Sequence, residues 1–347
     1  MTIVIAILVF GFIIFFHEFG HFIVAKRCGV KVNEFCLGFG PRLIGFKKGE
    51  TDYCLRLLPL GGACVMEGEE EDTDDERSFL KKPIWKRALI IAAGPLFNFL
   101  LAFILAAIML GTMGISEPVV SNVMEGYPAE EAGLREGDRI KALGNYDVHF
   151  YKEVTAFNFF NKEKPVEVTY IRDGKEYKTT LIPKFSEEDQ KYLLGVTGPA
   201  ENKKLNFFEA IGNAFYELRY QITVTFKSLG MLITGQVGIR DMSGPVGIVK
   251  VIGNTVKNSM PDGALYVVMN LFNITVLLSA NLGVMNLIPI PALDGGRLLF
   301  LLIEGVSRKK VSRKVEGYVN GAGFIALMAL MVIVLISDVA KIATGQM

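Results

Sequence analysis

The first apolar stretch decides the fold, and from Ile3 to Ala25 it reads IVIAILVFGFIIFFHEFGHFIVA. Crossing the hydrocarbon core of a bilayer takes roughly 20 apolar residues in a helix, and this stretch is long enough. It lacks a basic N-terminal region and a small-residue cleavage site, so we read it as a retained helix rather than a signal peptide. Ionisable groups inside a membrane span are costly and functional by default. The three in His17-Glu18-Phe19-Gly20-His21 therefore mark a candidate site.

Three further stretches can also cross a bilayer. The chain is 51% hydrophobic with a net charge of +1, which argues against a nucleic-acid-binding protein, because such proteins usually show a basic bias. The charges are concentrated between the apolar stretches, as expected for membrane spans joined by aqueous loops. The predicted spans are Ile3–Ala25, Ala88–Ile115, Ala264–Ile288 and Val319–Ile336.

The basic residues of the short loops predict the orientation, because cytoplasmic loops carry an excess of Lys and Arg. They cluster after the first span, before the second and before the fourth. Both chain ends and the long region between the second and third spans are therefore expected outside. The loop residues are Lys26, Arg27 and Lys31, then Lys81, Lys82, Lys86 and Arg87, then Arg308, Lys309, Lys310, Arg313 and Lys314.

The long outside region divides into two predicted parts. Alternating residues from Val166 to Tyr170, the Asp173-Gly174 turn and a return from Tyr177 to Ile182 predict a β-hairpin, and Tyr151–Asn161 predicts a helix. The second part, Leu205–Ile233, mixes apolar and charged residues. It predicts an amphipathic helix at the membrane surface, with a fifth span as the alternative.

The segment between the first two spans holds all four cysteines. None forms a Cys-x-x-Cys pair, which argues against a thiolate zinc site. If this segment is cytoplasmic, we expect reduced thiols. The acidic run Glu67–Glu76 predicts a solvated loop, with a regulatory role as the alternative. The cysteines are Cys28, Cys36, Cys54 and Cys64.

The H-E-x-x-H pattern in the first span predicts a metal site. His17 and His21 project from one helix face, where they can share one Zn²⁺, with Glu18 as general base. A catalytic zinc needs a third protein ligand. His149 lies in the predicted outside domain and reads as a surface histidine. The third ligand is therefore expected to be a carboxylate, and Asp294 is the best candidate.

Asp294 lies beyond a predicted break in the third apolar region. The break is Pro289-Ile-Pro291, since proline lacks a backbone N–H and clashes with the preceding helical turn. The apolar stretch Leu298–Ile303 continues that region. Irregular backbone at membrane depth is tolerated only where it lines a protein-enclosed or watery cavity. A carboxylate there is suited to metal ligation, proton transfer or ion binding, and the alternative is a helix-capping aspartate.

With these motifs, the sequence resembles the site-2 protease family of intramembrane zinc metalloproteases over essentially its whole length. Within the family it is similar to the bacterial regulator-of-sigma proteases. His17–His21 fits the H-E-x-G-H form, and Asn286–Gly295 fits N-x-x-P-x-P-x-L-D-G, whose aspartate is the third zinc ligand. The other matching segments are Gly94-Pro-Leu-Phe-Asn98, Gly38-Phe39-Gly40-Pro41, Pro59-Leu60-Gly61-Gly62 and Ser243-Gly244-Pro245-Val246-Gly247-Ile248.

The resemblance implies the fold, the cofactor and the partners. It implies an α-helical polytopic membrane protein of about four transmembrane helices, a membrane-associated β-hairpin region and one extracytoplasmic α+β domain. It implies Zn²⁺, a bacterial cell membrane with the active site toward the cytoplasm, and single-pass substrates such as pre-trimmed anti-sigma factors and signal-peptide remnants. It also implies substrate contacts from the hairpin edge, Asn281 and Asn286, and we expect Asn98 to bind substrate as well. Helix packing through hydrogen bonds is the alternative for these asparagines.

Tyr127–Ile140 resembles the PDZ domain, which binds peptides by strand addition. A domain that shields the active site without binding peptide is the alternative. The predicted domains are 1–115 (two spans and hairpin), 116–200 (PDZ-like), 201–261 (surface segment) and 262–347 (two spans with Asp294).

Two other functions fit the sequence less well. A zinc transporter usually has paired repeats around its site, whereas we find one site and no repeat. A non-catalytic scaffold that uses the PDZ-like domain would leave Glu18 without a role. The sequence therefore favours a protease in which Glu18 takes a proton from the attacking water and passes it to the leaving amine.

Overall fold

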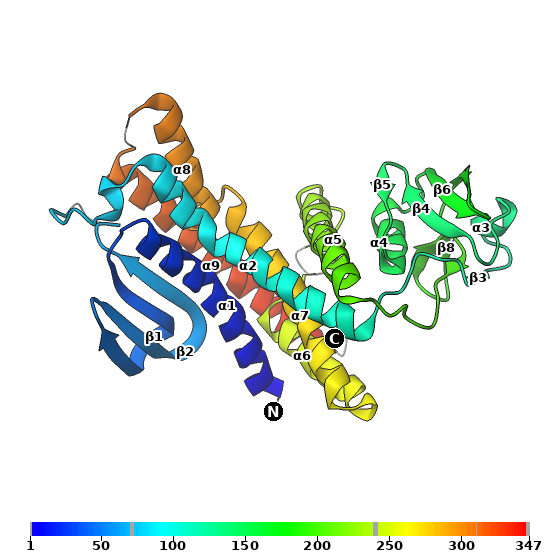
Figure 1. The fold of residues 1–347 in the computed structure, drawn as a ribbon, viewed down its shortest axis with the longest axis horizontal. Coiled ribbons are helices and arrows are strands. Elements are labelled where there is room, and N and C mark those ends of the chain that lie inside the picture. Colours follow the sequence, from blue (N-terminus) through cyan, green and yellow to red (C-terminus); the bar gives the residue numbers. More distant parts are fainter. Residues whose placement is uncertain (1, 70–72, 239–241, 310, 345–347) are drawn as a thin grey trace. The chain divides into compact units, whose positions relative to one another are not determined.

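The computed structural model describes residues 2–69, 73–238, 242–309 and 311–344. Residues 70–72 of the predicted acidic loop lie outside this range. The chain forms two compact units, whose elements are labelled in Figure 1. The membrane unit comprises Met1–Leu105 and Ser228–Met347, and the α+β unit comprises Ala106–Lys227.

The described residues include four helices long and apolar enough to cross a membrane, which confirms the predicted spans. The chain is therefore a multi-pass membrane protein. An unpredicted helix, α6, packs in the same unit, where Ile252 of α6 contacts Ala6 of α1 and Ile274 of α7. The helices are α1 (Thr2–Arg27), α2 (Ile84–Met113), α6 (Pro245–Ser259), α7 (Ala264–Leu287) and α9 (Arg313–Ala343).

A buried carboxylate joins α9 to α6. Asp338 is fully buried, and its two oxygens accept the backbone N–H groups of Gly244 and Gly247 at 3.0 and 2.9 Å. The first N–H groups of a helix have no partner within the helix, and a negative charge there is favourable. Asp338 thus caps α6 from another helix.

Two long strands, β1 (Val32–Lys48) and β2 (Thr51–Met66), form the sheet of the membrane unit. Each strand folds back on itself, so residues 32–37 pair with 62–66 on one side and with 52–55 on the other. The bends fall at glycines with positive φ, namely Gly38, Gly40 and Gly61, a conformation that glycine adopts at little cost. Segment 62–66 is consequently an edge of this sheet.

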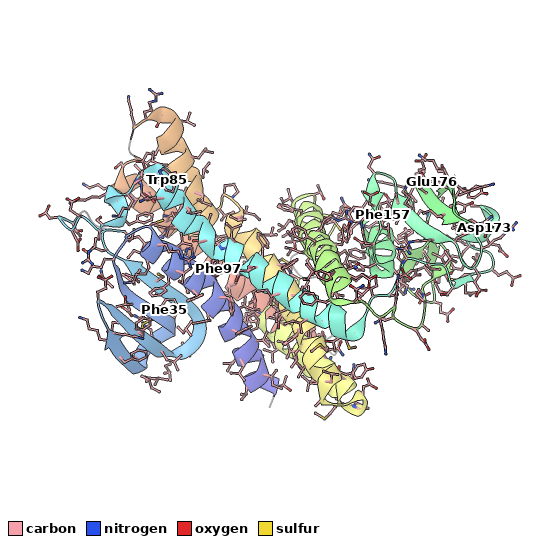
Figure 2. All side chains as sticks on the ribbon, in the orientation of Figure 1. Phe35, Trp85, Phe97, Phe157, Asp173 and Glu176 are labelled. Carbon is pink, nitrogen blue, oxygen red and sulfur yellow. A yellow bond between two sulfur atoms is a disulfide. The ribbon has the colours of Figure 1, made fainter. Side chains whose placement is uncertain are left out.

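Two parts of the sheet have different surroundings. Phe35, labelled in Figure 2, packs against Phe22 of α1 with ring centroids 5.1 Å apart. Farther along, Phe39, Ile44 and Phe46 are more than half exposed. Exposed apolar side chains of this size suit a bilayer, in agreement with the expected membrane-associated hairpin.

The cysteine prediction was wrong for one pair. Cys36 and Cys54 form a disulfide, with Cα atoms 4.5 Å apart, whereas Cys28 and Cys64 are free. Strand pairing places Cys36 directly opposite Cys54, and such a separation permits a disulfide. The sequence does not reveal this register.

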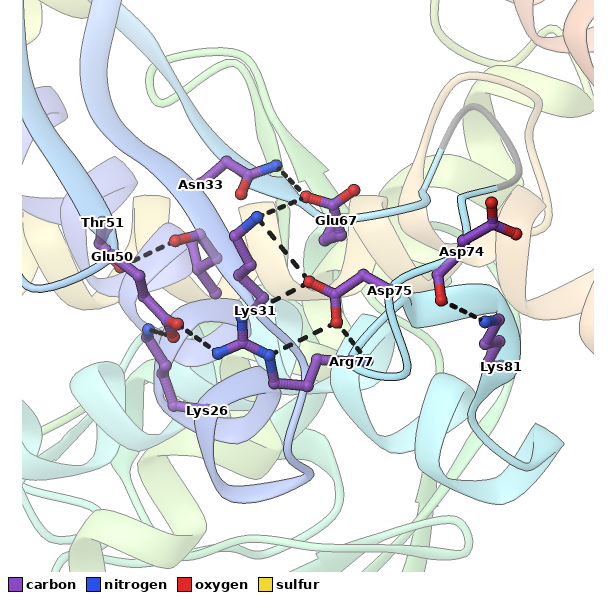
Figure 3. Close-up of polar contacts among 11 residues, drawn as sticks. Lys26, Lys31, Asn33, Glu50, Thr51, Glu67, Asp74, Asp75, Arg77 and Lys81 are labelled. Carbon is purple, nitrogen blue, oxygen red and sulfur yellow. Dashed lines mark hydrogen bonds and ion pairs between the residues drawn. The ribbon is translucent and has the colours of Figure 1, made fainter.

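Ion pairs hold the end of the sheet that contains Lys31, Glu50 and Glu67, here called the base of the sheet, as Figure 3 shows. Lys31 contacts Glu67 at 2.9 Å and Asp75 at 3.9 Å. Arg77 pairs with Glu50, near the tight turn between the strands. Glu67 of the predicted solvated loop is therefore held against the sheet rather than free in water.

The α+β unit confirms its predicted hairpin and helix. Strands β6 and β7 pair from Val166↔Leu181 to Arg172↔Lys175, and the connecting turn holds Asp173, labelled in Figure 2. The main sheet has the order β5-β4-β6-β7, with α4 at Tyr151–Asn161 as predicted. The elements are β3 (Asn122–Val123), α3 (Pro128–Glu131), β4 (Arg139–Leu143), β5 (Tyr146–Asp147), α4, β6 (Val166–Arg172), β7 (Lys175–Leu181), β8 (Lys184–Ser186), β9 (Lys191–Leu193) and β10 (Val196–Thr197).

Helix α5 (Phe207–Ile233) packs in this unit through its polar face, as far as Lys227. Glu217 is fully buried and pairs with Lys152 of α4. Burial lowers the pKa of Lys227, which lies 5.3 Å from the ring centroid of Phe157. The opposite face is apolar and exposed, through Phe207, Phe208, Ile211 and Phe215.

Candidate metal centre

Three side chains from two helices converge in the membrane unit. His17 and His21 lie one turn apart on α1, with their Nε2 atoms 3.3 Å apart. Asp294 Oδ2 lies 3.2 Å from His17 Nε2 and 3.4 Å from His21 Nε2. All three side chains are at most 16% exposed. The structure therefore brings together the three residues predicted as ligands.

A break between two helices presents Asp294. Helix α7 ends at Leu287, and α8 (Asp294–Ser307) begins at the aspartate itself. A Cβ at Gly295 would lie 2.2 Å from Ile288 O, and one at Gly296 would lie 2.4 Å from Ile290 O. Both positions require glycine because the backbone passes so closely. The predicted break after the third span is confirmed.

Helix α8 is also held to α2. Arg87 and Glu304 form a buried ion pair with two contacts, Nη2 to Oε1 at 2.7 Å and Nη1 to Oε2 at 3.3 Å. A forked guanidinium–carboxylate contact fixes direction as well as distance. The helix that carries Asp294 is thus fixed at both ends.

The three donor atoms fit zinc. Tetrahedral zinc with bonds of roughly 2.0–2.1 Å separates its ligand atoms by about 3.3 Å, as these atoms are separated. Asp294 Oδ2 is buried and makes no hydrogen bond, as expected of an oxygen reserved for a metal. A second cluster in the described residues, Glu34 with Cys36 and Cys54, has both sulfurs in the disulfide.

The other ring nitrogens of the histidines have partners that set the tautomers. His21 Nδ1 donates to Ile90 O at 2.9 Å, which leaves Nε2 free for a metal. The fully buried Asn98 amide lies 3.1 Å from His17 Nδ1, and its Oδ1 has no partner. With the amide turned over, Asn98 Oδ1 accepts a hydrogen bond from His17 Nδ1–H. Such outer contacts orient metal-binding imidazoles.

A cavity of about 470 Å³ opens beside these ligands. Glu18 lines it together with the edge segment 62–66 of the sheet. A Cβ at Gly62 would lie 2.5 Å from Glu18 Cγ, so only glycine permits this approach. Burial, reinforced by the negative charges of Glu18 and Glu69, raises the pKa of the Cys64 thiol in the lining.

The remaining predicted residues lie elsewhere. Asn281 and Asn286 are on α7 and are absent from the described lining of this cavity. His149 belongs to the α+β unit, where it stacks on Tyr216 with centroids 3.5 Å apart. The sequence analysis did not identify Glu69 and Arg297, which line the cavity as an ion pair. Arg297 could have been found from its position one helical turn beyond Asp294.

The helices and the site together define a membrane-embedded metalloprotease. The chain belongs to peptidase family M50, whose family model matches residues 5–330. It is a zinc metalloprotease of the site-2 protease family, as the sequence resemblance predicted.

Relatives match along nearly the whole chain. A protein of Clostridium acetobutylicum, described as a predicted zinc metalloprotease, is 39% identical over 97% of both chains. The Regulator of sigma-W protease RasP of Bacillus subtilis is 30% identical over 98% of this chain and 99% of its own. A solved PDZ domain of an SdrC-like protein of Listeria monocytogenes covers 25% of this chain and 87% of its own, with 17% identity and a TM-score of 0.21. A likeness at that TM-score supports no argument about the fold.

Proposed function

We propose that this metalloprotease cleaves single-pass membrane proteins within the bilayer, with zinc held by His17, His21 and Asp294 and with Glu18 as the general base. The convergence of Nε2, Nε2 and Oδ2 at zinc-like separations in the unit that carries the spans supports this proposal most directly. Zinc in such a site supplies a Lewis acid that polarises the scissile carbonyl and makes water more acidic.

The residues of the chain supply the remaining chemistry. The Glu18 carboxylate lines the cavity and takes one proton from the attacking water. The hydroxyl joins the carbonyl carbon, the carbon–nitrogen bond breaks, and Glu18 returns the proton to the leaving nitrogen. Asn98 and Ile90 O hold the two imidazoles in the required tautomers. Asn98 is buried against His17, so we assign it this orienting role in place of direct substrate contact.

The edge segment 62–66 is suited to hold the substrate. It lines the cavity and pairs with residues 32–37 along one side. An extended peptide can add to such an edge through main-chain hydrogen bonds. A helical substrate must unwind first, because its carbonyls are engaged within the helix. Asn281 and Asn286 on α7 would contact the unwound segment.

The name of one relative supports the proposed substrate class. The Bacillus relative is named as a regulator of a sigma factor, so pre-trimmed anti-sigma factors and signal-peptide remnants are the proposed substrates. The basic loops support an orientation in which the metal site faces the cytoplasm of a bacterial cell and the α+β unit lies outside.

Detergent-purified protein with a model transmembrane substrate tests the central proposal. Wild type should cleave it, and Glu18→Gln should retain about one zinc per chain but lose turnover, since the base is removed and the ligands remain. Asp294→Ala should lose zinc as well. Full zinc content and activity in Asp294→Ala would refute the ligand assignment.

We further propose that the PDZ-like domain excludes bulky substrates rather than recruiting trimmed ones. The chain segments that enter and leave this domain are paired by backbone hydrogen bonds. Ile115 N donates to Lys203 O at 3.0 Å, and Lys203 N donates to Ile115 O at 2.8 Å. Deleting Glu117–Ala200 with a short linker therefore reconnects neighbouring backbone. The deletion should permit cleavage of untrimmed substrate and spare that of trimmed substrate. Loss of trimmed-substrate cleavage at normal zinc content would favour recruitment.

A further inference from the structure

We propose that Glu69 and Arg297 are a positioning pair that fixes the substrate-binding edge of the sheet relative to the metal centre. The inference rests on the proposed function, because it assumes that segment 62–66 presents the substrate. Neither residue would contact the reacting atoms. Their role would be to set which peptide bond lies at the metal.

Glu69 connects two elements of the cavity wall. Its Oε2 accepts the backbone N–H of Met66, the last residue of β2, at 3.3 Å. Its Oε1 pairs with Arg297 Nη1. The Glu69 side chain is 14% exposed, and both residues line the cavity beside Asp294. One carboxylate therefore bridges the end of the edge segment and helix α8.

The position of Arg297 connects the bridge to the metal centre. Arg297 lies one turn beyond Asp294, so the pair reaches the helix that begins at the proposed third ligand. The sheet packs on α1 through Phe35 and Phe22, and α1 carries the other two ligands. The Glu69–Arg297 contact ties the same sheet to the third.

Glu67 offers a comparison within the same turn. Its carboxylate accepts from Lys31 at 2.9 Å and from Asn33 at 3.0 Å, as Figure 3 shows. These contacts lie within the base of the sheet and do not reach α8. Loss of the Glu67 contacts would loosen the turn, whereas loss of the Glu69 contact would free the edge segment from the metal centre.

Loss of the Glu69–Arg297 contact should affect most strongly the turnover rate and the choice of the peptide bond that is cleaved. A displacement of 1 Å at a reacting centre costs about 100-fold in rate, and neighbouring residues of a strand are roughly 3.3 Å apart. An edge segment that moves relative to the metal therefore presents its bound peptide less accurately, and adjacent bonds become accessible. Zinc binding should be unaffected because the three ligands are unchanged.

The experiment compares Glu69→Gln, Arg297→Gln and Glu67→Gln in full-length protein on one model transmembrane substrate. Zinc content, kcat, KM and the masses of the products are measured, with wild type and Glu18→Gln alongside. We expect Glu69→Gln and Arg297→Gln to keep about one zinc, lose about tenfold or more in kcat and add cleavage at neighbouring bonds. Glu67→Gln should keep the single cleavage position and stay within about threefold of wild type.

Three outcomes would overturn the inference. The first is a Glu69→Gln variant with wild-type kcat and one cleavage position. The second is loss of zinc from both Glu69→Gln and Arg297→Gln. The third is the same change in kcat and in cleavage position in Glu67→Gln as in Glu69→Gln. Exchange of the two residues, Glu69→Arg with Arg297→Glu, should not restore the single cleavage position, because arginine at position 69 cannot accept the Met66 N–H. Cleavage by wild type and its loss in Glu18→Gln establish the proposed function in the same assay, so these outcomes count against the pair alone.

Discussion

Replacing Gly94 by alanine should disable the metal centre from outside the ligand set. Gly94 lies on α2, where the helix passes beside both histidines. A Cβ there would lie 2.3 Å from His21 Nε2 and 2.8 Å from His17 Cε1, whereas ordinary contact begins near 3.4 Å. The His21 ring must therefore retreat by about 1 Å, because a helix backbone in a packed interior cannot easily move.

The size of the effect follows from that displacement. A metal site tolerates errors of roughly 0.2 Å in its ligand distances, so a shift of about 1 Å should remove one ligand. A displacement of that size in an active site costs about 100-fold in rate, equivalent to about 2.7 kcal/mol of transition-state stabilisation. We expect Gly94→Ala to lose most of its zinc and at least this much activity.

Zinc analysis and substrate cleavage on purified protein provide the assay. Gly11→Ala is the matched control, because it places the same methyl group in α1 at a position with nothing within 4 Å. The control should retain zinc and activity. Full zinc content with near-wild-type turnover in Gly94→Ala would refute the reasoning.

Three further predictions concern parts of the chain beyond the ligands. Asn98→Ala should weaken zinc binding by about 10–100-fold, since it removes the partner of His17 Nδ1; competition with a chelator measures this, and unchanged affinity would contradict it. Asp338→Ala should destabilise the protein by on the order of 2–5 kcal/mol, because it removes two charge-assisted hydrogen bonds, and wild-type thermal inactivation would refute this. An impermeant thiol reagent applied to intact cells should miss Cys28 but label a Lys175→Cys variant, and the opposite pattern would reverse the orientation.

The sequence was sufficient to predict the spans and to select the three residues that the structure brings together at the candidate metal centre. Spans are visible because apolar length alone defines them. The histidines are four residues apart on one helix, and Asp294 lies in a motif with two prolines and two glycines. Each of these signals is local, so no tertiary contact was needed to interpret it.

The remaining features depend on contacts that sequence does not encode locally. The disulfide of Cys36 and Cys54 follows from strand register, which the doubled-back glycine bends determine. Helix α5 was predicted as amphipathic, but periodicity does not show which face is buried, and Glu217 lies inside while Phe207 lies outside. The role of Asp338 as a cap depends on its contacts with two glycines that are distant in the sequence.

The late position of Asp294 in the chain has a consequence for biosynthesis. His17, Glu18 and His21 leave the ribosome with the first span, whereas Asp294 follows after the third. At roughly 5–20 residues per second, an interval on the order of tens of seconds separates them. With the ligands and base proposed above, the nascent chain would lack a complete centre during that time and should not cut itself or its neighbours. The order of the chain would then provide the latency that many secreted proteases obtain from a removable propeptide.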